Sequence, residues 1–154
     1  MNSEIAIQRC SYLELLDSPQ SEALLAEYAV ESSIAEIGPV NPHRPTYAAL
    51  ESAGVMQCFI ALRSGAIVGF ANVLASMVPH YSKRVATVES IFVPSACRRF
   101  GVGTALRKSM KVWAKEMDCV GTLSSAPAGG KLERVLERDR RCRKTNTVFF
   151  EGIN

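Results

Sequence analysis

Residues 98–106 of this chain read Arg98-Arg99-Phe100-Gly101-Val102-Gly103-Thr104-Ala105-Leu106. They follow an apolar strand candidate, residues 85–93, and open a helix whose apolar residues recur at helical spacing. The N–H groups of a helix's first turn have no intrahelical acceptor, so they can donate to phosphate oxygens. Gly101 and Gly103 allow the backbone to approach an anion closely, and Thr104 adds a hydroxyl donor. The segment therefore predicts a pyrophosphate-binding turn.

Two other glycine-rich phosphate loops do not fit this spacing. A P-loop requires Gly-Lys-Ser/Thr, whereas Gly103 is followed by Thr104 and Ala105. The dinucleotide fingerprint requires a third glycine where Leu106 stands, and an acidic ribose ligand after a second strand. The pattern that remains is Arg98-x-x-Gly101-x-Gly103.

This pattern, preceded by Glu89-Ser90-Ile91-Phe92-Val93-Pro94, resembles the signature of the GNAT superfamily of N-acetyltransferases. That signature is Gln/Arg-x-x-Gly-x-Gly/Ala between a strand and a helix, and its loop holds the pyrophosphate of acetyl coenzyme A (acetyl-CoA). The resemblance implies acetyl-CoA as co-substrate. The residues it assigns to coenzyme binding are Ile91, Phe92, Val93, Arg98, Arg99, Phe100, Gly101, Val102, Gly103 and Thr104.

Length and composition predict a single domain over residues 1–154, because 154 residues with 47% apolar content can bury a core. No apolar run approaches the roughly 20 residues that span a bilayer, and the N-terminus lacks a signal-peptide pattern, so we expect a cytoplasmic protein without membrane contact. The net charge of +3 is too small to indicate a nucleic-acid partner, and we expect none. The five cysteines are scattered, without a Cys-x-x-Cys pair, and predict no metal site.

The order of elements extends the resemblance to nearly the whole chain. It implies an α/β (α+β) GNAT fold, with a central mixed, mostly antiparallel sheet of six or seven strands flanked by about four helices. Residues 38–45 are expected to form a loop, since three prolines and a glycine interrupt them. We expect strands at residues 5–9, 58–63, 66–77, 85–93, 120–125 and 145–151, and helices after residues 11 and 18 and at about 46–52, 102–117 and 131–138.

Acetyl transfer to an amine requires a group that removes a proton from the amine and a polarised thioester carbonyl. Glu89 is the candidate base, because the family often places one in the strand before the phosphate loop; the alternative is a solvated strand residue. The resemblance assigns to the backbone of Ile91 and Val93 the pairing with the pantetheine arm. We expect a gap between residues 85–93 and 120–125 to admit that arm.

The proton donor departs from the family pattern. Leu136 stands where many relatives carry a tyrosine, so Ser124, Ser125 or water could protonate the leaving thiolate. His43 and His80 lie in loops that could border the acceptor site, or could be solvated. Arg98 and Arg99 are expected to contact phosphates.

Two functions remain open. The first is an N-acetyltransferase that transfers acetyl from acetyl-CoA to a primary amine of a small molecule or peptide, by direct attack in a ternary complex. The second is a non-catalytic GNAT-fold protein that binds coenzyme or serves in an assembly. Residues 131–137 and 145–150 are also similar to acetyltransferase-like proteins of tailed bacteriophages, and 145–150 is apolar enough for a homo-oligomer contact or a sheet edge.

Overall fold

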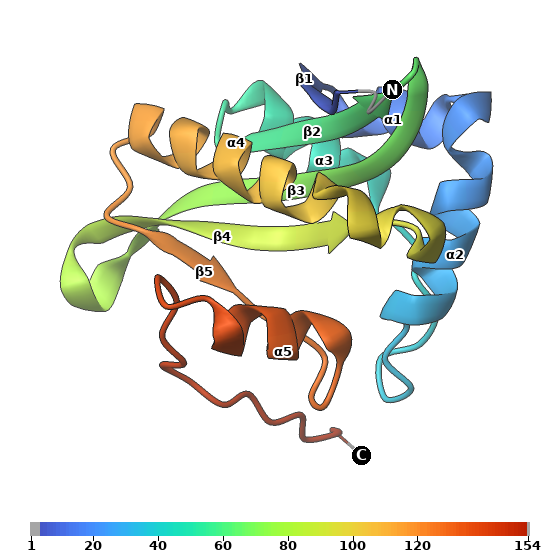
Figure 1. The fold of residues 1–154 in the computed structure, drawn as a ribbon. Coiled ribbons are helices and arrows are strands. Elements are labelled where there is room, and N and C mark those ends of the chain that lie inside the picture. The colour runs from blue at the N-terminus through green and yellow to red at the C-terminus, as the bar shows by residue number, and fades with distance from the viewer. Residues whose placement is uncertain (1–3, 154) are drawn as a thin grey trace.

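The computed structural model describes residues 4–153 and contains one five-stranded sheet in the order β1-β2-β3-β4-β5 (Figure 1). The first four strands pair antiparallel, and β4 pairs with β5 in parallel. A parallel pair needs a crossover connection, which α4 provides. The strands are β1 (Ala6–Cys10), β2 (Met56–Arg63), β3 (Ala66–Val78), β4 (Lys83–Phe92) and β5 (Thr122–Ser124).

Helices cover both faces of the sheet (Figure 1). Helix α4 packs on β2 and β3 from one side, and the first three helices pack on the other. Among the described residues no helix is long and apolar enough to cross a membrane. The helices are α1 (Tyr12–Asp17), α2 (Glu22–Ser32), α3 (Arg44–Ser52), α4 (Val102–Glu116) and α5 (Lys131–Arg138), with 3₁₀ turns at Pro19–Ser21, Pro79–Tyr81 and Ser95–Phe100.

Strand alternation divides the apolar side chains between two cores. In β2, Phe59 and Ala61 pack in the core that includes α4, whereas Met56 and Cys58 pack in the core that includes α1 and α2. The apolar stripe of α4 is buried as the helical spacing predicted, with Val102, Leu106, Met110 and Trp113 all at most 5% exposed. The sheet is therefore a shared wall between two hydrophobic layers.

A β-bulge interrupts the pairing of β3 with β4. Asn72 lies opposite Ser90, but the next residue, Val73, lies opposite Val88, so Glu89 has no partner on β3. Before the bulge Val88 packs on the α4 side, and after it Ile91 does so. The side chains of Glu89 and Ser90 can therefore both lie on the face of the sheet opposite α4, because a bulge interrupts strict alternation.

The expectation of six or seven strands was wrong, because residues 145–151 form no strand. The chain turns back along α5 after residue 138: Asp139 binds Arg107 of α4, and Lys144 Nζ lies 2.8 Å from Glu133 of α5. These ion pairs hold residue 144 beside α5. The segment that follows is extended and exposed, with Phe149 88% accessible.

The other elements differ from expectation mainly at their ends. Helix α3 begins at Arg44, two residues earlier than predicted, because Pro45 occupies the first turn of the helix, where its missing N–H costs no hydrogen bond. Strand β5 is shorter than the predicted 120–125, at three residues. Residues 4–153 contain five α-helices, where about four were expected, and α5 coincides with the predicted 131–138.

Gly69 of β3 lies where the strand packs closely against α4. A Cβ atom at this position would lie 3.0 Å from both the Phe92 carbonyl oxygen and Val102 Cγ1. Gly69→Ala is therefore expected to reduce the free energy of unfolding by about 1–3 kcal/mol through overpacking, measured by urea denaturation. Gly121→Ala is the matched control, since a Cβ there meets nothing within 4 Å. Equal stability of the two variants would contradict this packing.

Candidate active site

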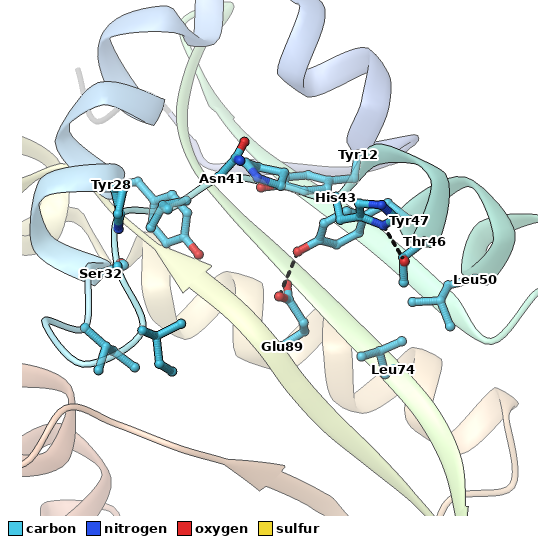
Figure 2. A pocket seen from close by; sticks show the side chains of 16 residues that line it. Tyr12, Tyr28, Ser32, Asn41, His43, Thr46, Tyr47, Leu50, Leu74 and Glu89 are labelled. Carbon is cyan, nitrogen blue, oxygen red and sulfur yellow. Dashed lines mark hydrogen bonds between the residues drawn. The ribbon is translucent and has the colours of Figure 1, made fainter. Parts of the chain in front are cut away.

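A cavity of about 510 Å³ lies on the face of the sheet opposite α4. Its wall comes from α1, α2, α3 and the loop between α2 and α3, and its floor from β3 and β4 (Figure 2). The lining residues are Tyr12, Tyr28, Ser32, Ile34, Ile37, Gly38, Pro39, Val40, Asn41, Pro42, His43, Thr46, Tyr47, Leu50, Leu74 and Glu89.

Glu89 projects from the bulge of β4 into this cavity (Figure 2). The Tyr47 hydroxyl donates a hydrogen bond to Glu89 Oε1 at 2.8 Å. Within the described lining, Glu89 is the one carboxylate. Its side chain is thus oriented by α3 while it remains accessible to a molecule in the cavity.

Three tyrosines surround the carboxylate. Burial raises the pKa of Tyr47, and the hydrogen bond to Glu89 raises it further because it favours the neutral phenol. Burial, followed by the nearby Tyr28 and Glu89, also raises the pKa of Tyr12. Burial and then Glu89 raise the pKa of Tyr28. All three hydroxyls therefore stay neutral to higher pH than in an unfolded chain, and that of Tyr47 donates to the carboxylate.

Aromatic contacts hold these rings in place. The ring centroids of Tyr12 and Tyr47 are 4.6 Å apart in an edge-to-face arrangement, and those of Tyr28 and Phe70 are 5.1 Å apart in the same geometry. Tyr28 also packs against Phe92 at 5.6 Å. The residues that position Glu89 are therefore anchored to the core beneath the cavity.

The pairing of β4 with β5 ends beside Glu89. The parallel ladder runs from Ala86 opposite Thr122 to Val88 opposite Ser124, and no later pair is formed in the described chain. The edge of β4 that faces β5 is consequently unpaired from Glu89 to Phe92. Unpaired backbone donors and acceptors at a strand edge can pair with an extended ligand.

The glycine-rich segment forms a tight turn into α4. Gly101 has a φ of +77°, a left-handed conformation that favours glycine, and it is the N-cap of the helix. Ala105 N donates to Gly101 O at 3.0 Å, so the N–H groups of residues 102–104 precede the first intrahelical bond. A Cβ at Gly103 would meet only Val93 Cγ2, at 3.9 Å. Internal packing therefore does not require glycine at this position.

Arg98 and Arg99, beside the glycine turn, have partners within the protein. Arg98 Nε donates to the Val93 carbonyl oxygen at 2.9 Å, and its Nη2 lies 2.5 Å from Glu31 of α2. Arg98 thus ties the end of β4 to α2. Arg99 is exposed and lies over the Phe100 ring, 5.1 Å from its centroid.

Of the other predicted site residues, His43 lines the cavity, and His80 and Ser125 lie outside it. His43 lines the cavity, and its Nδ1 lies 2.8 Å from Thr46 Oγ1. His80 lies outside that lining and packs against Tyr81. Ser125 is exposed and follows β5 directly, one residue beyond the Ser124–Val88 pair, and it does not line the cavity.

Sequence reasoning missed the three tyrosines of the cavity. Tyr12, Tyr28 and Tyr47 come from three different helices, and each has a position typical of a core residue. The available signal was the loop that carries His43, which was expected to border the acceptor site. It did not distinguish these rings from ordinary core aromatics, because only the packing of α1, α2 and α3 brings them together.

Residues 16–136 match the profile described as the Acetyltransferase (GNAT) family. The match covers more than half of the chain and includes the bulged strand, the glycine turn and α4. The chain belongs to the acetyltransferase (GNAT) family. No curated protein sequence matches this GNAT chain significantly.

Solved structures confirm the GNAT fold. An aminoglycoside acetyltransferase, meta-AAC0020, from an uncultured soil metagenomic sample in complex with sisomicin superposes with a TM-score of 0.71 at 17% identity, covering 97% of both chains. AAC(6')-Iy with a bisubstrate analogue gives 0.74 at 19% identity, covering 99% of both. The ribosomal-protein-alanine N-acetyltransferase from Brucella melitensis biovar Abortus 2308 gives 0.71 at 19% identity, covering 97% of this chain and 99% of that one.

The raised pKa of Tyr47 predicts how stability depends on alkaline pH. An unfolded tyrosine ionises near pH 10, whereas Tyr47 in the folded protein holds its proton to higher pH. The contribution of the protonated Tyr47 side chain to the free energy of unfolding is therefore present below pH 10 and is lost as the pH rises above it. Tyr47→Phe should reduce this loss by about 1 kcal/mol per pH unit, a value discounted for solvent screening at a half-buried group.

Urea denaturation of the wild type and Tyr47→Phe between about pH 10 and pH 11 measures the effect. The matched control is Tyr81→Phe, which removes a 70% exposed tyrosine outside the cavity. A slope for Tyr47→Phe equal to that of the control would contradict the prediction.

Proposed function

We propose that this protein is an acetyl-CoA-dependent N-acetyltransferase that acts on a primary amine of a small molecule or peptide by direct attack in a ternary complex. The observation that carries the proposal is the meeting of three features on β4: the carboxylate of Glu89 in the cavity, the unpaired strand edge that begins at the same residue, and the glycine turn that follows the strand. An acceptor and an acyl donor could approach β4 from its two sides.

Glu89 is the candidate base. Its carboxylate faces the cavity, where it can take a proton from a bound ammonium group directly or through water. The neutral amine then forms a nitrogen–carbon bond with the thioester carbonyl carbon, the carbon–sulfur bond breaks, and the thiolate leaves. The nitrogen of the adduct carries one proton more than the amide product, and water or the hydroxyl of Ser124 or Ser125 at the end of β5 is the candidate relay that passes this proton to the thiolate, since Leu136 stands where many relatives carry a tyrosine.

The coenzyme would lie along the β4 edge and the α4 N-terminus. Backbone groups of Ile91 at the unpaired end of β4, and the N–H of Val93 just beyond it, could pair with the pantetheine arm, whereas the Val93 carbonyl oxygen already accepts a hydrogen bond from Arg98 Nε. The N–H groups of Val102, Gly103 and Thr104 have no acceptor within α4 and could bind the pyrophosphate. The space above Gly103 supports this assignment, since no protein atom fills it closely.

The first experiment is calorimetric titration with acetyl-CoA, followed by thiol release with a panel of amines. Binding together with amine-dependent thiol release would support the proposal. Coenzyme binding without release for any amine would favour a non-catalytic coenzyme-binding role, and absence of binding would contradict the proposal and leave a role in an assembly.

Glu89→Gln should lower kcat/KM for amine acetylation by about 10²–10⁴-fold, because the amide cannot accept the proton. Its affinity for acetyl-CoA should remain that of the wild type, as measured by calorimetry. Glu14→Gln is the matched control, because Glu14 is an exposed carboxylate on α1 that does not line the cavity. Retention of wild-type kcat/KM in Glu89→Gln would exclude the carboxylate as the base.

Gly103→Asp and Gly103→Asn form a matched pair that tests the anion site by charge alone. Both side chains have room, and both are compatible with the first turn of α4. The aspartate variant should bind acetyl-CoA at least about tenfold more weakly than the asparagine variant, through repulsion of the pyrophosphate. Equal dissociation constants for the two variants would place the phosphates elsewhere.

A further inference from the structure

The lining of the cavity is unusual for a site that would receive a polycation. Among its described residues the one negatively charged group is Glu89, and the one other ionisable group apart from the tyrosines is His43. One carboxylate can neutralise one ammonium group. Further ammonium groups would lie against apolar or neutral side chains, where an unpaired charge is costly.

The rings around Glu89 suit a single cation with an apolar body. Tyr28 and Tyr47 present aromatic surface and neutral hydroxyls next to the carboxylate, and the buried Tyr12 packs against Tyr47 (Figure 2). Aromatic faces attract an ammonium group and also stack on an aromatic or aliphatic substituent. Because these rings are fixed by contacts with one another and with Phe70, the surface is formed before the acceptor binds.

Two apolar side chains at the cavity wall are exposed to solvent. Ile34 is 51% and Ile37 is 69% accessible, although both line the cavity. A short turn holds them there: Gly38 N donates to Ile34 O at 2.7 Å, and Ile37 N donates to the same oxygen at 3.0 Å. Exposed isoleucines on the wall of a pocket gain from contact with an apolar ligand.

We propose that the acceptor is a monocationic primary amine with one aromatic or branched aliphatic group. Its ammonium binds beside Glu89, and Ile34 and Ile37 cover the apolar group. This inference rests on the proposed function, since it names the acceptor class of the same site. A monocationic acceptor would distinguish this chain from the proteins named as aminoglycoside acetyltransferases, whose fold the chain shares at under 20% identity.

The test uses the full chain saturated with coenzyme A for binding, and with acetyl-CoA for turnover. The probes are 2-phenylethylamine and isoamylamine as apolar monoamines, ethanolamine as a short polar monoamine, and spermidine and kanamycin as polycations. Calorimetry gives each dissociation constant, and thiol release gives each kcat/KM. The apolar monoamines should exceed the other three probes at least about tenfold in affinity.

Ile37→Ser supplies the second arm. It should weaken 2-phenylethylamine binding about fivefold to tenfold and leave ethanolamine binding unchanged, because only the former places an apolar group on Ile37. Val30→Ser is the matched control, since Val30 is 81% exposed on α2 and lies outside the cavity lining. An equal effect of the two variants on 2-phenylethylamine would overturn the inference.

The outcomes separate this inference from the proposed function. Tight binding of 2-phenylethylamine without thiol release would support the amine class and contradict acetyl transfer. Acetylation with kanamycin or spermidine as the best substrate would support acetyl transfer and overturn the amine class. Failure of all five probes to bind would overturn the inference even if acetyl-CoA binds.

Discussion

The site depends on the β-bulge at Glu89. A strand without a bulge presents successive residues to opposite faces. The extra residue in β4 lets Glu89 contact Tyr47 of α3 while its neighbour Ser90 accepts a hydrogen bond from Asn72 on the same side of the sheet. Beyond the bulge Ile91 packs again on the α4 core, and Phe92 packs in the core on the opposite face. A single inserted residue therefore places a carboxylate in the cavity without loss of either hydrophobic layer.

The bulge also coincides with the end of the β4–β5 ladder. Val88 is the last residue of β4 that pairs with β5, and Glu89 is the next. The strand edge that could receive an acyl donor thus begins where the carboxylate enters the acceptor cavity. The glycine turn lies beyond the same strand, and Arg98 fixes that turn by its bond to the Val93 carbonyl. One strand connects the three parts of the proposed site.

The two ends of the cavity have different chemical character. Near β4, neutral tyrosine hydroxyls surround the carboxylate, and burial is the main cause of their raised pKa values. Near the loop between α2 and α3, isoleucines and prolines form the wall. This division suits a molecule with one charged end, since each part would meet a surface of matching polarity.

The sequence by itself determined the local features: the glycine turn, the buried stripe of α4, the positions of most strands and the family. These follow from spacing within short segments, because helical and strand periods are local properties of the chain. Only the tertiary structure decided the bulge at Glu89, the gathering of Tyr12, Tyr28 and Tyr47, and the exposed path of residues 145–151. Each of these depends on which distant segments meet. The alternation of side chains along one strand does not show which of its residues lacks a partner on the adjacent strand. Nor does it show whether an apolar segment pairs with the edge of a sheet.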